Sequence, residues 1–195
     1  FGGHHPDTSE PYAHFHFEGV GWGARWGQDG NNVVIVINGN CMATPVEIFE
    51  TRFPFIIESY RLLTDSGGAG QWRGGLGGER ILTVKAPEIT VSALFNRTRL
   101  APPGRSGGSD GAKAGIYIKR LEDENFSTFK EIFNTISEAK FSGITVKNGD
   151  QVQLVFPGGG GFGNPRDRDP GLVRRDIELG FISREAASSV YGVGD

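Results

Sequence analysis

Four consecutive glycines, Gly158, Gly159, Gly160 and Gly161, are the first candidate for chemistry in this 195-residue chain. Successive backbone N–H groups that carry no side chains can converge on an anion, so the run is able to cradle a phosphate. It lacks the Lys-Ser/Thr pair of a P-loop, and it ends in Asn164-Pro165 instead of opening into a helix. The alternative is a tight structural crossing of backbone segments.

A second candidate lies in the loop 65–78, DSGGAGQWRGGLGG. Asp65 and Arg73, with Glu79 and Arg80 just beyond, form a possible charge-paired ligand site with Trp72 as its apolar wall. In the alternative interpretation, Asp65 caps its own turn and Arg73 pairs locally. The second interpretation is favoured because few residues define a site.

The histidines raise the question of a metal centre. They are His4, His5, His14 and His16, near the acidic residues Asp7, Glu10 and Glu18. Side chains at i and i+2 of a strand share one face, so His14 and His16 have workable ligand geometry. No third ligand follows at a recognisable spacing, and His4 and His5 diverge if they lie on a strand. The sequence therefore predicts no metal site in this chain.

Nucleophilic catalysis has little support. Cys41, the single cysteine, has no identifiable base near it in the sequence, and no serine lies in a strand-turn-helix elbow. Residue chemistry alone yields no complete active site.

Composition excludes several classes. The 31 glycines are about 16% of the chain against a usual share of roughly 7%, but they cluster instead of recurring every third residue, which excludes collagen. A net charge of −3 provides no field for nucleic acid. The longest apolar run, 33–37, is far shorter than the roughly 20 residues of a membrane span. A single cysteine fits a reducing cytoplasm. We expect a cytoplasmic protein that binds neither nucleic acid nor membrane.

The elements that must position these residues are mostly strands. Residues 33–37 are β-branched and predict a buried strand, and alternation suggests further strands at 12–17 and 47–52. Other strands are expected at 55–63, 80–85, 89–95 and 116–120. Residues 144–146 and 151–156 flank an Asn-Gly pair, which predicts a hairpin.

The remaining segments are helical or undecided. Asp169-Pro170 predicts a helix over 170–179, and Ser183 a second over 184–191 that ends at Gly192. Residues 122–140 fit no single element. The fold class is therefore α+β and β-dominated, with glycine-rich loops between mostly antiparallel strands and short C-terminal helices. We divide it into a β-rich domain, 1–168, and a helical tail, 169–195.

Three long segments together resemble one family. They are TPVEIFETRFPFIIESYRLLTDSGGAGQWRGGLGGER (44–80), PGGGGFGNPRDRDPGLVRRDIELGFISREAASSVYGV (157–193) and the N-terminal FGGHHPDTSEPYAHFHFEGVGWGARWGQDG. This combination resembles the hydantoinase B/oxoprolinase family, which includes N-methylhydantoinase B and the corresponding subunits of acetone and acetophenone carboxylases. The family's subunits are several times longer, so the resemblance implies that this chain is a C-terminal portion.

The resemblance implies a multisubunit, ATP-dependent enzyme that either hydrolyses cyclic amides such as hydantoins and 5-oxoproline or carboxylates ketones such as acetone and acetophenone. Its expected partners are a hydantoinase A-type ATP-binding subunit and the N-terminal portion of the hydantoinase B-type subunit, with a small-molecule substrate. ATP and a divalent metal are expected in the partner or in that N-terminal portion, and none in this chain. The isolated chain is expected to be inactive.

Five residues fall within the matching motifs, namely Glu18, Arg25, Asp65, Ser66 and Arg73. The resemblance makes them candidates for shaping the substrate site or a subunit interface and identifies no catalytic residue. It matches neither His4 nor His5 to the family's metal ligands. Trp22 and Trp26 are able to line an apolar pocket for a ketone, although such aromatics more often belong to the core. The competing hypothesis is a non-catalytic assembly module of a multisubunit enzyme.

Overall fold

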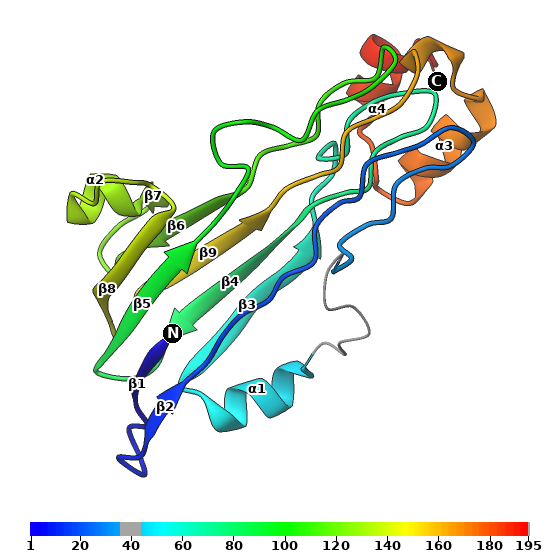
Figure 1. The fold of residues 1–195 in the computed structure, drawn as a ribbon. Coiled ribbons are helices and arrows are strands. Elements are labelled where there is room, and N and C mark those ends of the chain that lie inside the picture. The colour runs from blue at the N-terminus through cyan, green and yellow to red at the C-terminus, as the bar shows by residue number, and fades with distance from the viewer. Residues whose placement is uncertain (36–43, 195) are drawn as a thin grey trace.

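Two antiparallel sheets form the main body of the protein (Figure 1). The structure is a computed structural model that describes residues 1–35 and 44–194. The larger sheet has the order β3-β4-β9-β6-β7, and the smaller has the order β2-β1-β5-β8. The larger sheet contains β3 (Phe55–Leu62), β4 (Gly78–Val84), β6 (Gly115–Lys119), β7 (Ser127–Thr128) and β9 (Gln151–Phe156). The smaller contains β1 (Gly2–His4), β2 (Pro11–Ala13), β5 (Glu88–Leu94) and β8 (Lys140–Lys147). The predicted β-dominated α+β class is confirmed.

One apolar core joins the two sheets. Val152, Leu154 and Phe156 of β9 alternate with more exposed residues, and so do Ile89 and Val91 of β5. All five belong to a single cluster of buried side chains. This is the arrangement of a sandwich, in which the inner faces of two sheets interdigitate.

The predicted hairpin at Asn148-Gly149 is wrong, although both of its strands exist. β8 pairs with β5 in the smaller sheet, whereas β9 lies between β4 and β6 in the larger. The turn instead carries the chain from one sheet to the other. The buried Asp150 carboxylate fixes it by accepting hydrogen bonds from the N–H groups of Leu121 (3.1 Å) and Lys147 (3.0 Å). Non-local pairing overrides the local turn signal here.

The strand expected at 47–52 is wrong as well, because Val46–Arg52 forms helix α1. Pro45 directly precedes the helix, and its carbonyl accepts the N–H of Phe49 at 3.0 Å. Phe49 is the buried residue of the helix and packs in the core. A helix this short buries few side chains, so its pattern is easily mistaken for alternation.

Two other strand predictions fail in part. Residues 33–35 contribute only an isolated bridge between Val34 and Val20, because Val33 adopts a positive φ of 41° that breaks extended pairing. The rest of that predicted strand, and Cys41, lie outside the described residues. The strand expected at 12–17 ends at Ala13. Residues 14–18 nevertheless alternate in direction, as described below.

The helices follow the sequence signals at the C-terminus. Helix α3 (Pro170–Glu178) has Asp169 as its N-cap, and α4 (Arg184–Ala186) has Ser183, as predicted. A π-helical turn, η2 (Ala187–Tyr191), extends α4 and ends at Gly192.

The undecided stretch 122–140 contains β7, helix α2 (Phe129–Phe133) and the first residue of β8. A short 3-10 turn, η1 (Pro165–Asp167), precedes α3. Among the described helices, none is long and apolar enough to cross a membrane.

The glycine-rich segments form a bundle at one end of the sheets. We call this the glycine bundle, and it consists of residues 19–23, 29–33, 66–70, 73–77, 102–112 and 157–163. Its members run side by side from the sheets toward α3 and α4 (Figure 1), joined by backbone hydrogen bonds. The small tail cluster of Val173, Ile182, Ala187 and Tyr191 packs against Ala69 of the bundle. The division of the chain at residue 168 stays a prediction.

Candidate functional site

The glycine run lies at the centre of the glycine bundle. The N–H groups of Gly158, Gly159 and Gly161 donate to the carbonyls of Ala112 (3.1 Å), Gly75 (2.8 Å) and Ser109 (2.9 Å) respectively. Amides already bonded to the backbone are not available to a phosphate. This geometry fits the structural crossing, because a Cβ on Gly159 would lie 1.9 Å from the carbonyl oxygen of Trp22.

Asp65 and Ser66 join the glycine bundle to its neighbours. The Asp65 carboxylate accepts the N–H of Ser183 at 2.9 Å, and its own N–H donates to the carbonyl of Phe181 at 3.0 Å. The hydroxyl of Ser66 donates to the carbonyl of Leu63 and accepts the N–H of Gly77. Arg25 lies in an exposed turn and bonds Gln28. The structure brings none of these three into the pocket described below.

Arg73 belongs to a buried ion-pair network that we call the Arg-Asp network. It joins Arg73 and Arg168 to Asp29 and Asp176. Arg168 binds both carboxylate oxygens of Asp29, at 2.8 and 2.7 Å, and reaches Asp176 at 2.7 Å. Arg73 Nε lies 3.3 Å from the same Asp176 oxygen. Burial alone would raise the pKa of Asp29, but the Arg168 guanidinium holds it below its usual value. The network ties the helical tail to the bundle.

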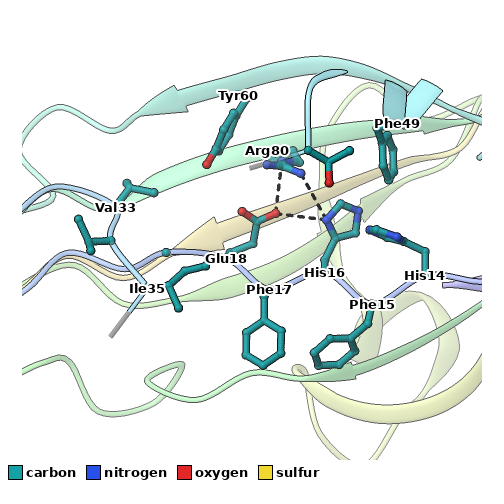
Figure 2. Close-up of a pocket in the computed structure, with 13 residues that line it drawn as sticks. His14, Phe15, His16, Phe17, Glu18, Val33, Ile35, Phe49, Tyr60 and Arg80 are labelled. Carbon is teal, nitrogen blue, oxygen red and sulfur yellow. Dashed lines mark hydrogen bonds and ion pairs between the residues drawn. The ribbon is translucent and has the colours of Figure 1, made fainter. Parts of the chain in front are cut away.

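A pocket of about 370 Å³ lies where the N-terminal segment crosses β3 and β4 (Figure 2). This size is at the small end of the range for ligand sites. Its lining residues come from residues 14–19, from 33–35, and from Thr44, Phe49, Tyr60 and Arg80. Of the residues that the sequence singled out, the structure places Glu18, His14, His16 and Arg80 in this pocket.

Residues 14–18 face two ways. Figure 2 shows His14, His16 and Glu18 directed toward β4, and Phe15 and Phe17 directed to the opposite side. The two phenylalanine rings contact each other at 4.8 Å between centroids and are 75% and 61% exposed. The segment therefore buries its polar side chains and exposes its aromatic ones.

Three side chains meet on the floor of the pocket, and we call them the polar floor. Glu18 Oε1 lies 3.4 Å from His16 Nδ1 and 3.3 Å from Arg80 Nε, and Arg80 Nη1 lies 3.3 Å from His16 Nδ1. Arg80 shares the inner face of β4 with Leu82, because side chains two apart in a strand point the same way. Its guanidinium lies over the ring of Tyr60, its cross-strand neighbour, at 4.1 Å.

Both imidazoles of the pocket are neutral at pH 7. Burial lowers the pKa of His14 to about 4, and the neighbouring His16, N-terminus and Arg80 lower it further. Burial also lowers the pKa of His16, although Glu18 opposes the shift. Glu18 and Arg80 then compensate each other, so the polar floor has no net charge.

The polar floor is poorly satisfied by its own members. Six buried side-chain nitrogen or oxygen atoms in the described residues have no hydrogen-bond partner, and three of them are Glu18 Oε1, His16 Nε2 and Arg80 Nε. The ion-pair distances are short enough, but the N–H bonds are not aligned with their acceptors. Buried polar atoms are nearly always paired in folded proteins, so Glu18 and Arg80 depend on the ion pair between them, at 3.3 Å, for compensation.

The histidine environment makes a testable prediction about pH. Because the pKa of His14 is about 4 in the fold and near 6.5 in the unfolded chain, the unfolded state binds more protons between these values. The contribution of His14 to the free energy of unfolding is therefore expected to be complete above pH 6.5, and the free energy of unfolding is expected to fall as the pH drops toward 4. Urea unfolding of His14→Gln should show a shallower fall than the wild type. The exposed His4→Gln is the matched control and should retain the wild-type slope; equal slopes for all three proteins would contradict the assignment.

A metal centre finds no support in the described residues, where no group of three or more His, Cys, Asp or Glu side chains is placed to hold an ion. Sequence reasoning associated Arg80 with Asp65 and Arg73, whereas the fold pairs it with Glu18. It also missed Tyr60. The available signal was the alternation His14-x-His16-x-Glu18, which puts three polar side chains on one face of an extended segment.

Two antiparallel sheets, a backbone-bonded glycine bundle and a small pocket with a polar floor define the chain as a β-rich α+β protein segment. Residues 1–165 match the family model described as hydantoinase B/oxoprolinase. The chain belongs to this family, as the sequence resemblance indicated.

Individual relatives agree with that assignment. The chain is 31% identical over 172 residues to the B-type component of a putative D-/L-hydantoinase of Pseudomonas sp. (strain NS671), covering 88% of this chain and 28% of the relative. It is 34% identical over 158 residues to the beta chain of the caprolactamase of Pseudomonas jessenii, covering 80% and 26%. The solved nucleotide-free structure of acetone carboxylase, described in terms of ATP-dependent acetone carboxylation, superposes with a TM-score of 0.75 at 26% identity, covering 98% of this chain and 29% of that one. The chain thus spans less than a third of each of these three relatives.

Proposed function

We propose that this chain is the C-terminal part of a hydantoinase B-type subunit in an ATP-dependent, multisubunit, cytoplasmic enzyme that opens cyclic amides or carboxylates ketones. Family membership over residues 1–165 carries the proposal. The names of the relatives support it, since they include a hydantoinase subunit, a caprolactamase subunit and an acetone carboxylase. In this proposal the pocket above the polar floor contributes to the small-molecule site.

ATP does not fit the candidate cradle in this chain. The N–H groups of Gly158, Gly159 and Gly161 donate to backbone carbonyls. Neighbouring backbone lies so close to these residues that not even a Cβ atom would fit. The described residues also contain no metal cluster. In this proposal, ATP and any divalent metal bind to a hydantoinase A-type partner or to the N-terminal portion of the subunit. The isolated chain is expected to be inactive.

Reconstitution tests the proposal. The full-length subunit containing this chain is purified from its source with its associated proteins, and ATP hydrolysis is measured with a hydantoin, 5-oxoproline, or acetophenone plus bicarbonate. We expect a large ATP-binding protein to co-purify and one substrate class to stimulate ATP turnover several-fold. Purification without such a partner, or turnover indifferent to every substrate, would count against it.

A second function, a non-catalytic assembly module, is favoured by one observation. The Arg-Asp network and the glycine bundle place most buried polar groups of the described chain in structural roles. That hypothesis predicts that Glu18→Gln in the reconstituted complex leaves substrate-stimulated ATP turnover unchanged, whereas the first predicts a loss.

A further inference from the structure

The glycine bundle presents a group of aromatic side chains to solvent. Trp26 is 75% exposed, although its ring contacts that of Trp72 at 4.6 Å between centroids, and Trp72 in turn contacts Phe162 at 5.8 Å. We call these three rings the aromatic tip. Within the described residues, they belong neither to the two apolar cores nor to the lining of the pocket above the polar floor. Contiguous exposed aromatic surface that no core uses is typical of an interaction site.

The backbone beneath the aromatic tip holds it in place. Arg25 and Gln28 exchange two backbone hydrogen bonds, both at 3.1 Å, so Trp26 lies in a closed turn. Trp72 and Phe162 likewise exchange two backbone hydrogen bonds, at 3.0 and 2.9 Å. Since the turn and the stacked rings are preorganised, little conformational entropy is lost when another surface covers them.

The aromatic tip is flanked by uncompensated positive charge. Arg25 lies on the turn itself, and Arg105 lies beside Phe162, with which it forms a parallel bridge. Both arginines are exposed, and within the described part of the chain neither takes part in an ion pair. Asp29, the acid closest to the turn in sequence, is already paired with Arg168. A surface that carries carboxylates would therefore form charge pairs here that the chain does not supply.

These properties favour a protein surface as the occupant. Trp and Arg are enriched among the residues that carry the binding energy of protein–protein interfaces, where an aromatic anchor fills a pocket of the partner. A nucleic acid requires an extended row of cations, which two arginines on a chain of net charge −3 do not provide. The complementary surface is therefore an apolar pocket with carboxylates at its rim.

The position of the aromatic tip selects between the two protein surfaces that the proposed function offers. Figure 1 shows the turn 25–28, in blue beside α3, at one end of the molecule and the N-terminus beside β1 at the other. In the proposed function the N-terminal portion of the subunit precedes Phe1, so it joins the chain at the end remote from the tip. A second subunit is the better placed occupant, and the relatives named above include proteins described as subunits.

We propose that the aromatic tip docks the subunit onto its ATP-binding partner, with Trp26 inserted into an apolar pocket of the partner and with Arg25 and Arg105 facing carboxylates at its rim. The inference rests on the proposed function for the existence of the partner, and it goes further by locating the contact surface. Because no ring of the tip lines the pocket above the polar floor, the tip is expected to govern assembly and not substrate binding.

Binding between purified subunits tests this. The full-length subunit containing this chain is separated from the ATP-binding protein that co-purifies with it, and the Kd of the pair is measured by calorimetry. Trp26→Ala should raise the Kd at least about tenfold, as expected for a central anchor, and Trp26→Phe should recover most of the affinity. Ile136→Ala is the matched control, because Ile136 is an apolar residue that is fully exposed but follows α2, away from the glycine bundle. It should leave the Kd unchanged.

The charged rim has its own variant. Replacing Arg25 and Arg105 together by alanine should weaken binding at low salt and make the Kd less dependent on salt, because the charge pairs that salt screens are lost. A salt dependence equal to that of the wild type would refute the role of the two arginines, whether or not the Trp26 variants fold.

An equal Kd for Trp26→Ala and Ile136→Ala would overturn the proposal. If Trp26→Ala also lowers the thermal midpoint of the free subunit, the N-terminal portion of the same subunit covers the tip instead. If Trp26→Ala abolishes binding of an oligothymidylate probe and leaves the Kd for the partner unchanged, the tip binds nucleic acid. A wild-type pair that associates but shows no substrate-stimulated ATP turnover contradicts the proposed function and leaves the docking result standing. A wild-type subunit that binds no ATP-binding protein contradicts both.

Discussion

Replacing Gly159 by alanine is expected to lower the free energy of unfolding by about 3 kcal/mol or more. The added Cβ would lie 1.9 Å from the carbonyl oxygen of Trp22 and 2.7 Å from the nitrogen of Gly23. Both contacts are with backbone, which cannot rotate away as a side chain does. The Gly159 N–H bond to Gly75 and its carbonyl bond from Gly68, both 2.8 Å, hold the residue in place from two sides. The clash is therefore relieved only if the segments of the glycine bundle move apart.

Gly23→Ala is the matched control within the same bundle. Its added Cβ would meet only the carbonyl oxygen of Gly160, at 3.8 Å, which is an ordinary contact. We expect its free energy of unfolding to stay within about 0.5 kcal/mol of the wild type. Urea unfolding followed by tryptophan fluorescence measures both proteins. Similar unfolding midpoints for Gly159→Ala and Gly23→Ala would show that the bundle is looser than described.

The second large effect is expected at Asp176 of helix α3. Asp176→Asn removes the charge that both Arg73 and Arg168 contact and leaves Asp29 as the remaining ion-pair partner of Arg168. All three affected residues, Arg73, Arg168 and Asp176, are at most 4% exposed. Breaking a buried ion pair from one side typically costs about 3–5 kcal/mol, because the partner charges stay buried. We expect a loss of about 3 kcal/mol, since Asp29 still compensates Arg168.

Glu178→Gln provides the control for that experiment. Glu178 is an exposed carboxylate two residues further along the same helix, so it tests the helix and its charge without touching the network. It should change the free energy of unfolding by less than about 0.5 kcal/mol. The two variants are compared by urea unfolding at pH 7. An Asp176→Asn protein as stable as Glu178→Gln would mean that the Arg-Asp network contributes no net stability.

Local signals in the sequence predicted the elements that local physics determines. Asp169-Pro170 begins a helix because an acceptor side chain caps it and the proline ring presets φ, and the structure has that helix. The buried alternation of Val152, Leu154 and Phe156 likewise identifies a strand whatever its neighbours are. These features depend on residues close together in the chain.

Features that depend on distant residues were not accessible in this way. Asn148-Gly149 has every local property of a hairpin turn, yet Val146 pairs with Ile89 and Leu154 pairs with Arg80 and Ile116. Strand pairing is decided by which sheet each strand completes, and no local pattern records that. Local sequence patterns therefore predict strands, but they do not predict the order of the strands within the two sheets.

The pocket was missed for a related reason. Glu18 and Arg80 are 62 positions apart in the sequence, and only the crossing of residues 14–18 over β4 brings them together. Arg80 seemed to belong with the charged loop before it, because sequence proximity suggested that grouping. The spacing of His14 and His16 predicted a shared face, but it did not indicate that Glu18 continues this face or that the face is the buried one.

The glycine bundle also has a consequence for hydrogen exchange. Irregular segments normally exchange their amide protons quickly, since few of their N–H groups are bonded and buried. In the bundle, the N–H groups of Gly30, Gly68, Gly74 and Gly159 each donate to a carbonyl of another segment at 2.8–2.9 Å. When one segment of the bundle opens, its hydrogen bonds to the neighbouring segments break as well, because the backbones bond each other directly. These amides should exchange as slowly as those of β4 and β9, so a region without helix or strand would behave as part of the most protected unit of the protein.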